Sequence, residues 1–200
     1  TGIVGGLGVG GLLETIGTNF VANRSMAIFM MILLVTGTLE RNGLREAAAN
    51  LIKKVKSATA GKLIAVYGVL NGLFGAFNVG FGGVAGFIRP VLLPMAEGAI
   101  ENKEGTVNEE HLEEVKGLAA AMQNFTWFFF QVLFVGGAGG ILVQTTLAGL
   151  GYEVSLIDLA AVEIPVALFA LVVSCVYVIV KDNQISKKYY GKSAGKKAQK

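Results

Sequence analysis

The sequence predicts an all-α, polytopic membrane protein with a re-entrant helical hairpin and a broken transmembrane helix, and three observations lead to this fold class. Of the 200 residues 53% are hydrophobic and 16% are charged, whereas a soluble domain has about 45–50% apolar and about 25% charged residues. Residues 63–88 and 117–152 contain no charged side chain, although a membrane-spanning helix needs only about 20 apolar residues. Glycine clusters interrupt both of these stretches.

The distribution of charge and cysteine excludes other classes of protein. Basic residues gather at 41–62 and 181–200, and each group adjoins an apolar segment, which assigns both groups to the cytoplasmic side by the positive-inside rule. Aromatic residues do not interleave the first group as a nucleic-acid stacking platform would require, so we expect no nucleic-acid partner. The single Cys175 lies in an apolar segment and cannot form an internal disulfide.

The first two apolar segments, about residues 1–22 and 25–39, are predicted membrane spans. Thr1 begins in the middle of apolar sequence without a basic leader, so the segment is not a signal peptide, and we expect the natural chain to extend before Thr1. In residues 41–61 apolar residues recur at helical spacing between basic ones. That pattern predicts a helix lying flat on the cytoplasmic surface.

Residues 62–100 predict the re-entrant hairpin. Glycines cluster at residues 78–86, and Pro90 and Pro94 follow; a straight helix would not tolerate this combination. Two arms of about 13 to 16 residues are each shorter than the roughly 20 residues of a span. We therefore expect the chain to enter and leave the membrane on one side.

Residues 101–116 are rich in glutamate and contain His111, the single histidine of the sequence. We predict a solvated, acidic cytoplasmic loop that is partly helical from Asn108 onward. The paired glutamates of this segment could act as acid/base groups or metal ligands. Because no apolar pocket surrounds them in the sequence, a solvated run of charges is the favoured interpretation.

Residues 117–151 predict the broken helix. As one helix, the charge-free stretch would be about 54 Å long, well beyond a hydrocarbon core of about 30 Å. We place the break at the glycine-rich residues 136–140. Residues 156–180 form the last span, which delivers the basic tail, residues 181–200, to the cytoplasm.

Breaks within a bilayer leave backbone groups without partners unless protein or a wet cavity covers them, so both breaks are candidate parts of a substrate site. Arg89 is the strongest single candidate, because its planar guanidinium could bind a carboxylate at membrane depth. The alternative is that Arg89 reaches the interface or pairs with an acid such as Glu97. For Gln123, Asn124, Thr126 and Gln131 the alternative is hydrogen bonding between helices. The predicted substrate-binding residues are Asn78, Gly80, Gly82, Gly83, Arg89, Gln123, Asn124, Thr126 and Gln131.

Three runs of the sequence, ETIGTNFVANR from Glu14 to Arg24, LERNGLR from Leu39 to Arg45, and RPVLLPMAEG from Arg89 to Gly98, carry a resemblance to a known family. The chain resembles, from about Thr1 to Val180, the smaller subunit of the bacterial two-component 5-oxoproline (pyroglutamate) transporter, which looks like one half of the ion transporter superfamily. It departs from relatives in that superfamily by lacking a Ser-Asn-Thr triplet at the hairpin tip and by having Gln131 where acidic residues are expected.

The resemblance implies a bacterial inner-membrane carrier of inverted-repeat design whose other half is a second, larger polytopic subunit, often doubled into a dimer of heterodimers. It also implies a small carboxylate substrate, such as 5-oxoproline, and coupling to sodium ions or protons, with no bound cofactor. The hairpin tip and residues 136–140 would close around the anion. A non-transporting membrane scaffold or accessory subunit is the alternative function. No nucleophile–base pair or metal-ligand cluster indicates an enzyme.

Overall fold

The computed structural model describes residues 5–22, 26–55 and 58–191, which form helices and no strand. Residues 1–4 of the first predicted span, Arg24 and residues 192–200 of the basic tail lie outside the described residues. The elements, in chain order, are α1 (Gly8–Ala22), α2 (Met26–Arg41), α3 (Leu44–Lys53), α4 (Ala60–Gly75), the π-helix η1 (Val84–Leu92), α5 (Leu93–Glu104), α6 (Glu109–Phe130), the 3₁₀ turn η2 (Gln131–Leu133), α7 (Ala138–Gly149) and α8 (Leu156–Tyr190).

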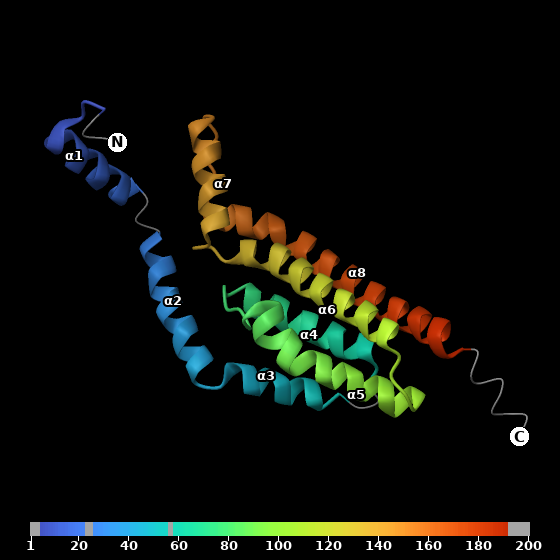
Figure 1. The fold of residues 1–200 in the computed structure, drawn as a ribbon. Helices are drawn as coiled ribbons and strands as arrows, with labels where there is room; N and C mark the ends of the chain where they lie inside the picture. The colour runs from blue at the N-terminus through green and yellow to red at the C-terminus, as the bar shows by residue number, and fades with distance from the viewer. Residues whose placement is uncertain (1–4, 23–25, 56–57, 192–200) are drawn as a thin grey trace, which may run out of the picture.

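Helices α4, α6 and α8 pack against one another as the centre of the molecule. The chain runs along α4, turns, and comes back through η1 and α5, while α8 runs antiparallel to α6 (Figure 1). Helices α1 and α2 stand to one side, and α2 ends near the tip of the α4–α5 hairpin (Figure 1). The buried side chains of α3, α4, η1, α5 and α6 form one core that Val178 of α8 joins.

Glycines allow the central helices to approach closely. A Cβ placed on Gly61 would lie 2.5 Å from Cβ of Asp182 in α8, and one placed on Gly68 would lie 2.5 Å from Sδ of Met122 in α6. Close approach through small residues is the usual way in which helices associate in an apolar solvent. The glycines of α4 therefore set its distance from both neighbours.

Helix α4 and the η1–α5 segment form a helical hairpin of two antiparallel arms (Figure 1). Helix α4 begins at the N-cap Thr59, whose hydroxyl accepts a hydrogen bond from the backbone N–H of Lys62. The tip spans residues 76–83, where Asn78 has a φ of 57° and Gly82 and Gly83 also have positive φ values. Pro90 lies inside η1, where the wide π-helical turn accommodates a residue that lacks the backbone N–H.

The predicted break in the following helix is present but begins earlier than residues 136–140. Helix α6 ends at Phe130, η2 follows, and α7 starts at Ala138 in a direction bent by 55°. The turn between them is closed by the N–H of Gly137, which donates to the carbonyl of Phe134 over 2.8 Å. Gly139 and Gly140 lie inside the first turn of α7, after the bend.

Two predicted segments differ from the structure. Within residues 101–116 the helix predicted from Asn108 onward is confirmed, since α6 begins at Glu109 and Asn108 caps it by accepting from two backbone N–H groups. The expected loop is shorter than predicted, because α5 runs to Glu104. Helix α8 continues past residue 180 to Tyr190, so the first half of the predicted tail is helical. Helix α3 lies within the predicted surface helix, residues 41–61; its Ala48 and Ile52 are buried, whereas Leu51 is exposed.

Within the described part of the chain, α8 is long and apolar enough to cross a membrane, and α6 with α7 would make a second such span if the bent pair is counted as one. Only 11% of the apolar window of α8 is buried within the structure.

Candidate functional site

The hairpin tip and the break after α6, which are far apart in sequence, adjoin in the structure. A cavity of about 350 Å³ lies between them and α2. This volume is within the range of small-molecule sites, roughly 300–1,000 Å³. Its walls are apolar apart from one hydroxyl: Val35, Thr36 and Leu39 come from α2, Phe74, Phe77 and Val79 from the hairpin, and Phe134 from the break.

Thr36 supplies that hydroxyl. Its Oγ1 is buried and has no hydrogen-bond partner among the described residues. A buried polar atom without a partner is destabilising by about 1–3 kcal/mol. Thr36 therefore contributes a polar atom beside the cavity that the described residues leave unsatisfied.

Two residues of α6 face the hairpin tip. A Cβ placed on Gly80 would lie 3.5 Å from Cζ3 of Trp127, and one placed on Gly83 would lie 3.8 Å from Nε2 of Gln123. Gly83 combines a φ of 63° with a ψ of −150°, a conformation that is essentially restricted to glycine. The tip thus brings predicted residues Gly80, Gly83 and Gln123 together and adds Trp127, which the sequence did not single out.

Arg45 is a second residue that the sequence did not single out. Its Nη2 would lie 2.9 Å from a Cβ on Gly82, so its guanidinium rests against the backbone of the tip. Arg45 comes from the start of α3, and a pattern confined to neighbouring residues could not have connected it with the hairpin.

Thr126 has a structural partner. Its hydroxyl accepts a hydrogen bond of 2.7 Å from Nδ2 of Asn71 and donates one of 2.7 Å to the carbonyl of Met122. Both Thr126 and Asn71 are buried. This is the interhelical bonding that was the alternative for Thr126, and Asn71, a lone polar residue in the apolar sequence of α4, was the signal that could have revealed it.

Of the four other predicted residues, Asn78 belongs to the tip itself, whereas Arg89, Asn124 and Gln131 are not among the nearest neighbours of its glycines. Arg89 is exposed in the second half of η1, and its side chain makes no hydrogen bond or ion pair within the described residues. Asn124 is exposed on α6, and Gln131 is half-buried at the start of η2. Asn78 is half-buried at the end of the turn after α4, where its backbone N–H donates to the carbonyl of Gly75 over 2.8 Å.

A separate polar cluster lies where α5, α6 and α8 meet, at the end of the bundle away from the hairpin tip (Figure 1). His111 is buried, although we had placed it in a solvated loop, because the end of α8 packs over it. Its Nδ1 is 3.2 Å from the hydroxyl of Tyr190, which also accepts from the N–H of Asn108. Its Nε2 has no partner among the described residues, and Asp182 is buried beside this cluster.

Burial and neighbouring negative charges shift the pKa of His111 in opposite directions. Desolvation lowers the pKa of the imidazole below its usual 6.5, against the opposing influence of Asp182, Glu104 and Glu114. At the rim of the cluster, hydrogen bonds from Lys188 and Tyr189 lower the pKa of the Glu114 carboxyl. The described residues contain no group of three or more metal-ligating side chains.

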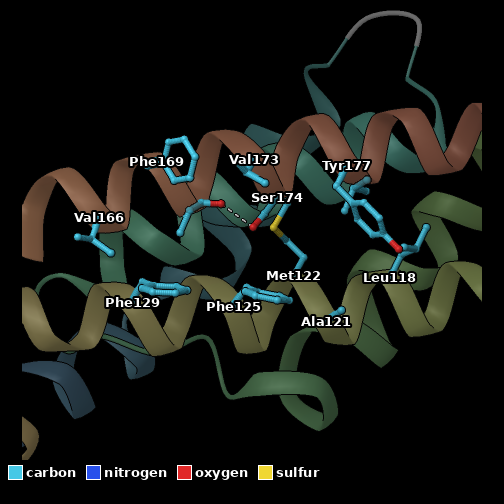
Figure 2. A pocket seen from close by; sticks show the side chains of 12 residues that line it. Leu118, Ala121, Met122, Phe125, Phe129, Val166, Phe169, Val173, Ser174 and Tyr177 are labelled. Carbon is cyan, nitrogen blue, oxygen red and sulfur yellow. Dashed lines mark hydrogen bonds between the residues drawn. The ribbon is translucent and has the colours of Figure 1, made fainter.

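An apolar groove of about 560 Å³ runs between α6 and α8. Figure 2 shows Phe125 and Phe129 of α6 and Phe169 of α8 along it, with the Ser174 hydroxyl turned to the carbonyl of its own helix. An ion would be poorly solvated between such walls. The smaller cavity is equally apolar, so what distinguishes the hairpin tip is the pair of polar side chains, Arg45 and Gln123, that lie against its glycines.

Comparison with curated proteins gives no match. Comparison with solved structures likewise gives none. The model of a protein family described as Protein of unknown function (DUF969) matches residues 1–186, and the chain therefore belongs to this family.

Proposed function

We propose that this chain is one subunit of a secondary transporter that moves a small organic anion, such as 5-oxoproline, across the bacterial inner membrane by alternating access. A second, larger membrane subunit supplies the other half of the carrier. The observation that carries the proposal is the cavity between the hairpin tip and the break after α6.

Exposed apolar surface supports placement in a membrane. Large hydrophobic side chains are exposed along α8, among them Val162, Phe169 and Val172, each more than 60% exposed. Monomeric soluble proteins rarely expose contiguous apolar patches of this kind. A multi-pass arrangement has α8 as one span and α6 with α7 as a bent span, with the basic end of α8 in the cytoplasm.

The hairpin then enters the membrane without crossing it. Its first arm, α4, has 16 residues, a length of about 24 Å at 1.5 Å per residue, shorter than a hydrocarbon core of about 30 Å. Backbone groups at the tip would be costly in lipid, but not beside a wet cavity. Secondary transporters place their substrates at such interruptions near the middle of the membrane.

The apolar cavity and the polar side chains at the neighbouring tip glycines, which do not themselves line the cavity, together fit a small, partly apolar anion. Phe74, Phe77 and Phe134 provide a surface for a carbon skeleton, whereas Arg45 and Gln123 lie against the tip glycines and provide hydrogen-bond donors. Sites of this type combine apolar walls with a few placed polar groups. Coupling to sodium ions or protons would supply the driving force.

Uptake of radiolabelled 5-oxoproline, lactate and succinate into proteoliposomes tests the proposal, with the chain purified together with its membrane partner. Gly83→Ala should reduce uptake at least tenfold, because alanine strains the backbone conformation of Gly83. Gly98→Ala in α5 is the matched control, since a Cβ there meets open space, and it should keep full uptake.

Two outcomes would count against this function. Absence of uptake of all three anions by the unaltered complex would favour a scaffold over a carrier of small carboxylates. Equal uptake by the Gly83→Ala and unaltered proteins would show that the hairpin tip is not part of the pathway.

A further inference from the structure

Arg45 lies against the hairpin tip and is held there by the shape of the backbone. A Cβ on Gly82 would lie 2.9 Å from Nη2 and 3.2 Å from Cζ of Arg45, and a Cβ on Gly86 would lie 3.6 Å from Nη1. The guanidinium fits in this position because Gly82 has no side chain. The contact joins α3 to the first turn of η1.

The guanidinium of Arg45 retains unused hydrogen-bond donors. An arginine has five N–H donors, and Nε of Arg45 is buried without a partner among the described residues. Its ion pair with Glu40 is 3.8 Å long, whereas charge-assisted hydrogen bonds are about 2.7–2.9 Å. Glu40 therefore balances the charge of Arg45, but it does not satisfy all the N–H donors of the guanidinium.

The same group is accessible to a ligand. The Arg45 side chain is 40% exposed and that of Glu40 is 35% exposed, so a small anion can reach the pair without unfolding the tip. Gln123 approaches the tip through Gly83 and could donate from its amide. Arg89, by contrast, is exposed in the second half of η1 and makes no contact of this kind within the described residues.

We propose that Arg45 binds the carboxylate of the transported anion at the hairpin tip, and that Glu40 occupies Arg45 when the site is empty. This inference rests on the proposed function and deepens it, because it names the cation that recognises the substrate. The fork of a guanidinium matches a carboxylate through two parallel N–H···O bonds. A ligand carboxylate at hydrogen-bonding distance replaces the long ion pair with Glu40.

The test measures how strongly the site prefers a carboxylate to its neutral carboxamide. Calorimetric titration of the purified complex with 5-oxoproline, lactate and succinate, each beside its carboxamide, gives this ratio of dissociation constants. Arg45→Gln should reduce the ratio about 10- to 100-fold, and Arg45→Lys should restore part of it. Arg41→Gln, at an exposed arginine in the last turn of α2, is the matched control and should leave the ratio unchanged.

The Glu40→Gln variant tests whether Arg45 binds the ligand or has only a structural role. If Glu40 competes with the ligand for Arg45, removing its charge should tighten carboxylate binding several-fold. If the Glu40–Arg45 pair merely orders the connection between the end of α2 and the start of α3, Glu40→Gln should weaken binding of acid and amide alike. The second result would overturn the inference, even where Arg45→Gln fails to fold.

The outcomes distinguish this inference from the function on which it rests. A complex that binds the acids, with the same acid-to-amide ratio in Arg45→Gln as in the unaltered protein, overturns the role of Arg45 and leaves the transporter proposal standing. A complex that neither binds nor transports any of the three acids overturns both.

Discussion

Asn71 and Thr126 connect α4 to α6 through two buried polar side chains that satisfy each other. The Thr126 hydroxyl both accepts from Asn71 and donates to a carbonyl of its own helix, so its capacity is used within the protein. A buried donor that loses its partner is destabilising by about 1–3 kcal/mol. The pair therefore matters for helix packing rather than for ligand contact.

Thr126→Val should lower the free energy of unfolding by about 1–3 kcal/mol, because Asn71 loses its closest acceptor. The double variant Thr126→Val with Asn71→Leu should lose less free energy of unfolding than the sum of the losses in the two single variants. Thermal unfolding in detergent measures both effects. Loss of carboxylate binding by Thr126→Val at unchanged stability would instead assign Thr126 to the ligand.

His111 makes stability depend on pH. Burial lowers its pKa in the folded protein below 6.5, so the neutral imidazole is favoured by folding. Its contribution is fully present above about pH 6.5 and is lost as the pH falls from there through the lower pKa of the folded state. The groups that face the imidazole are Lys103 and Glu104 from α5, Glu114 from α6, and Asp182, Tyr189 and Tyr190 from α8.

The melting temperature should therefore fall between pH 7.5 and pH 5, and it should fall less in His111→Gln, which has no imidazole to protonate. Differential scanning fluorimetry of the two proteins across this range is the measurement. An identical decrease in both proteins would mean that other groups, such as the rim carboxylates, cause the acid sensitivity.

At the scale of the element, α4 depends on glycine where it meets its neighbours. Met122, which is 1% exposed, fills the space above Gly68, and a Cβ there would lie 2.5 Å from its sulfur. Overpacking of a close helix contact typically destabilises a protein by about 1–3 kcal/mol. Helical propensity alone would favour alanine at the same position by up to about 1 kcal/mol.

Gly68→Ala should therefore lower the melting temperature, whereas Gly98→Ala should raise it slightly, since a Cβ on Gly98 meets open space. Both substitutions replace glycine by alanine within a helix, so the difference between their melting temperatures reports on the α4–α6 contact. A stabilising Gly68→Ala would show that Met122 moves aside without loss of packing.

For the whole molecule, the exposed apolar face of α8 requires an apolar environment. Phe169 and Val172 are 72% and 61% exposed, and they lie within the stretch that is long and apolar enough to span a membrane. A lysine near the centre of a span costs about 2.5–3.5 kcal/mol on insertion scales. The same lysine on a water-exposed helix would cost almost nothing.

Replacement of both Phe169 and Val172 by lysine should release much of the chain from membranes during an alkaline wash. Leu51→Lys on α3, where Leu51 is 49% exposed, is the control and should leave the chain in the membrane fraction. Immunoblots of pellet and supernatant measure the distribution. Retention of the double variant would mean that α8 does not face lipid or an apolar partner.

The sequence alone indicated where helices form and where they stop, because those properties depend on residues within a few turns. The apolar stretches, the glycine cluster after Asn78 and the amphipathic pattern before residue 61 predicted the hairpin arms, the tip and α3. The second break was misplaced by several residues, because glycines at the start of α7 suit a helix once the turn at Phe134 has formed.

Only the tertiary structure decided which groups meet. It placed Arg45 rather than Arg89 on the tip glycines, paired Thr126 with Asn71, and buried His111 beneath the end of α8. The physical reason is the distance along the chain over which the deciding interactions act. Local composition acts through neighbouring backbone and side chains, whereas the position of a guanidinium relative to a distant turn depends on how whole helices pack.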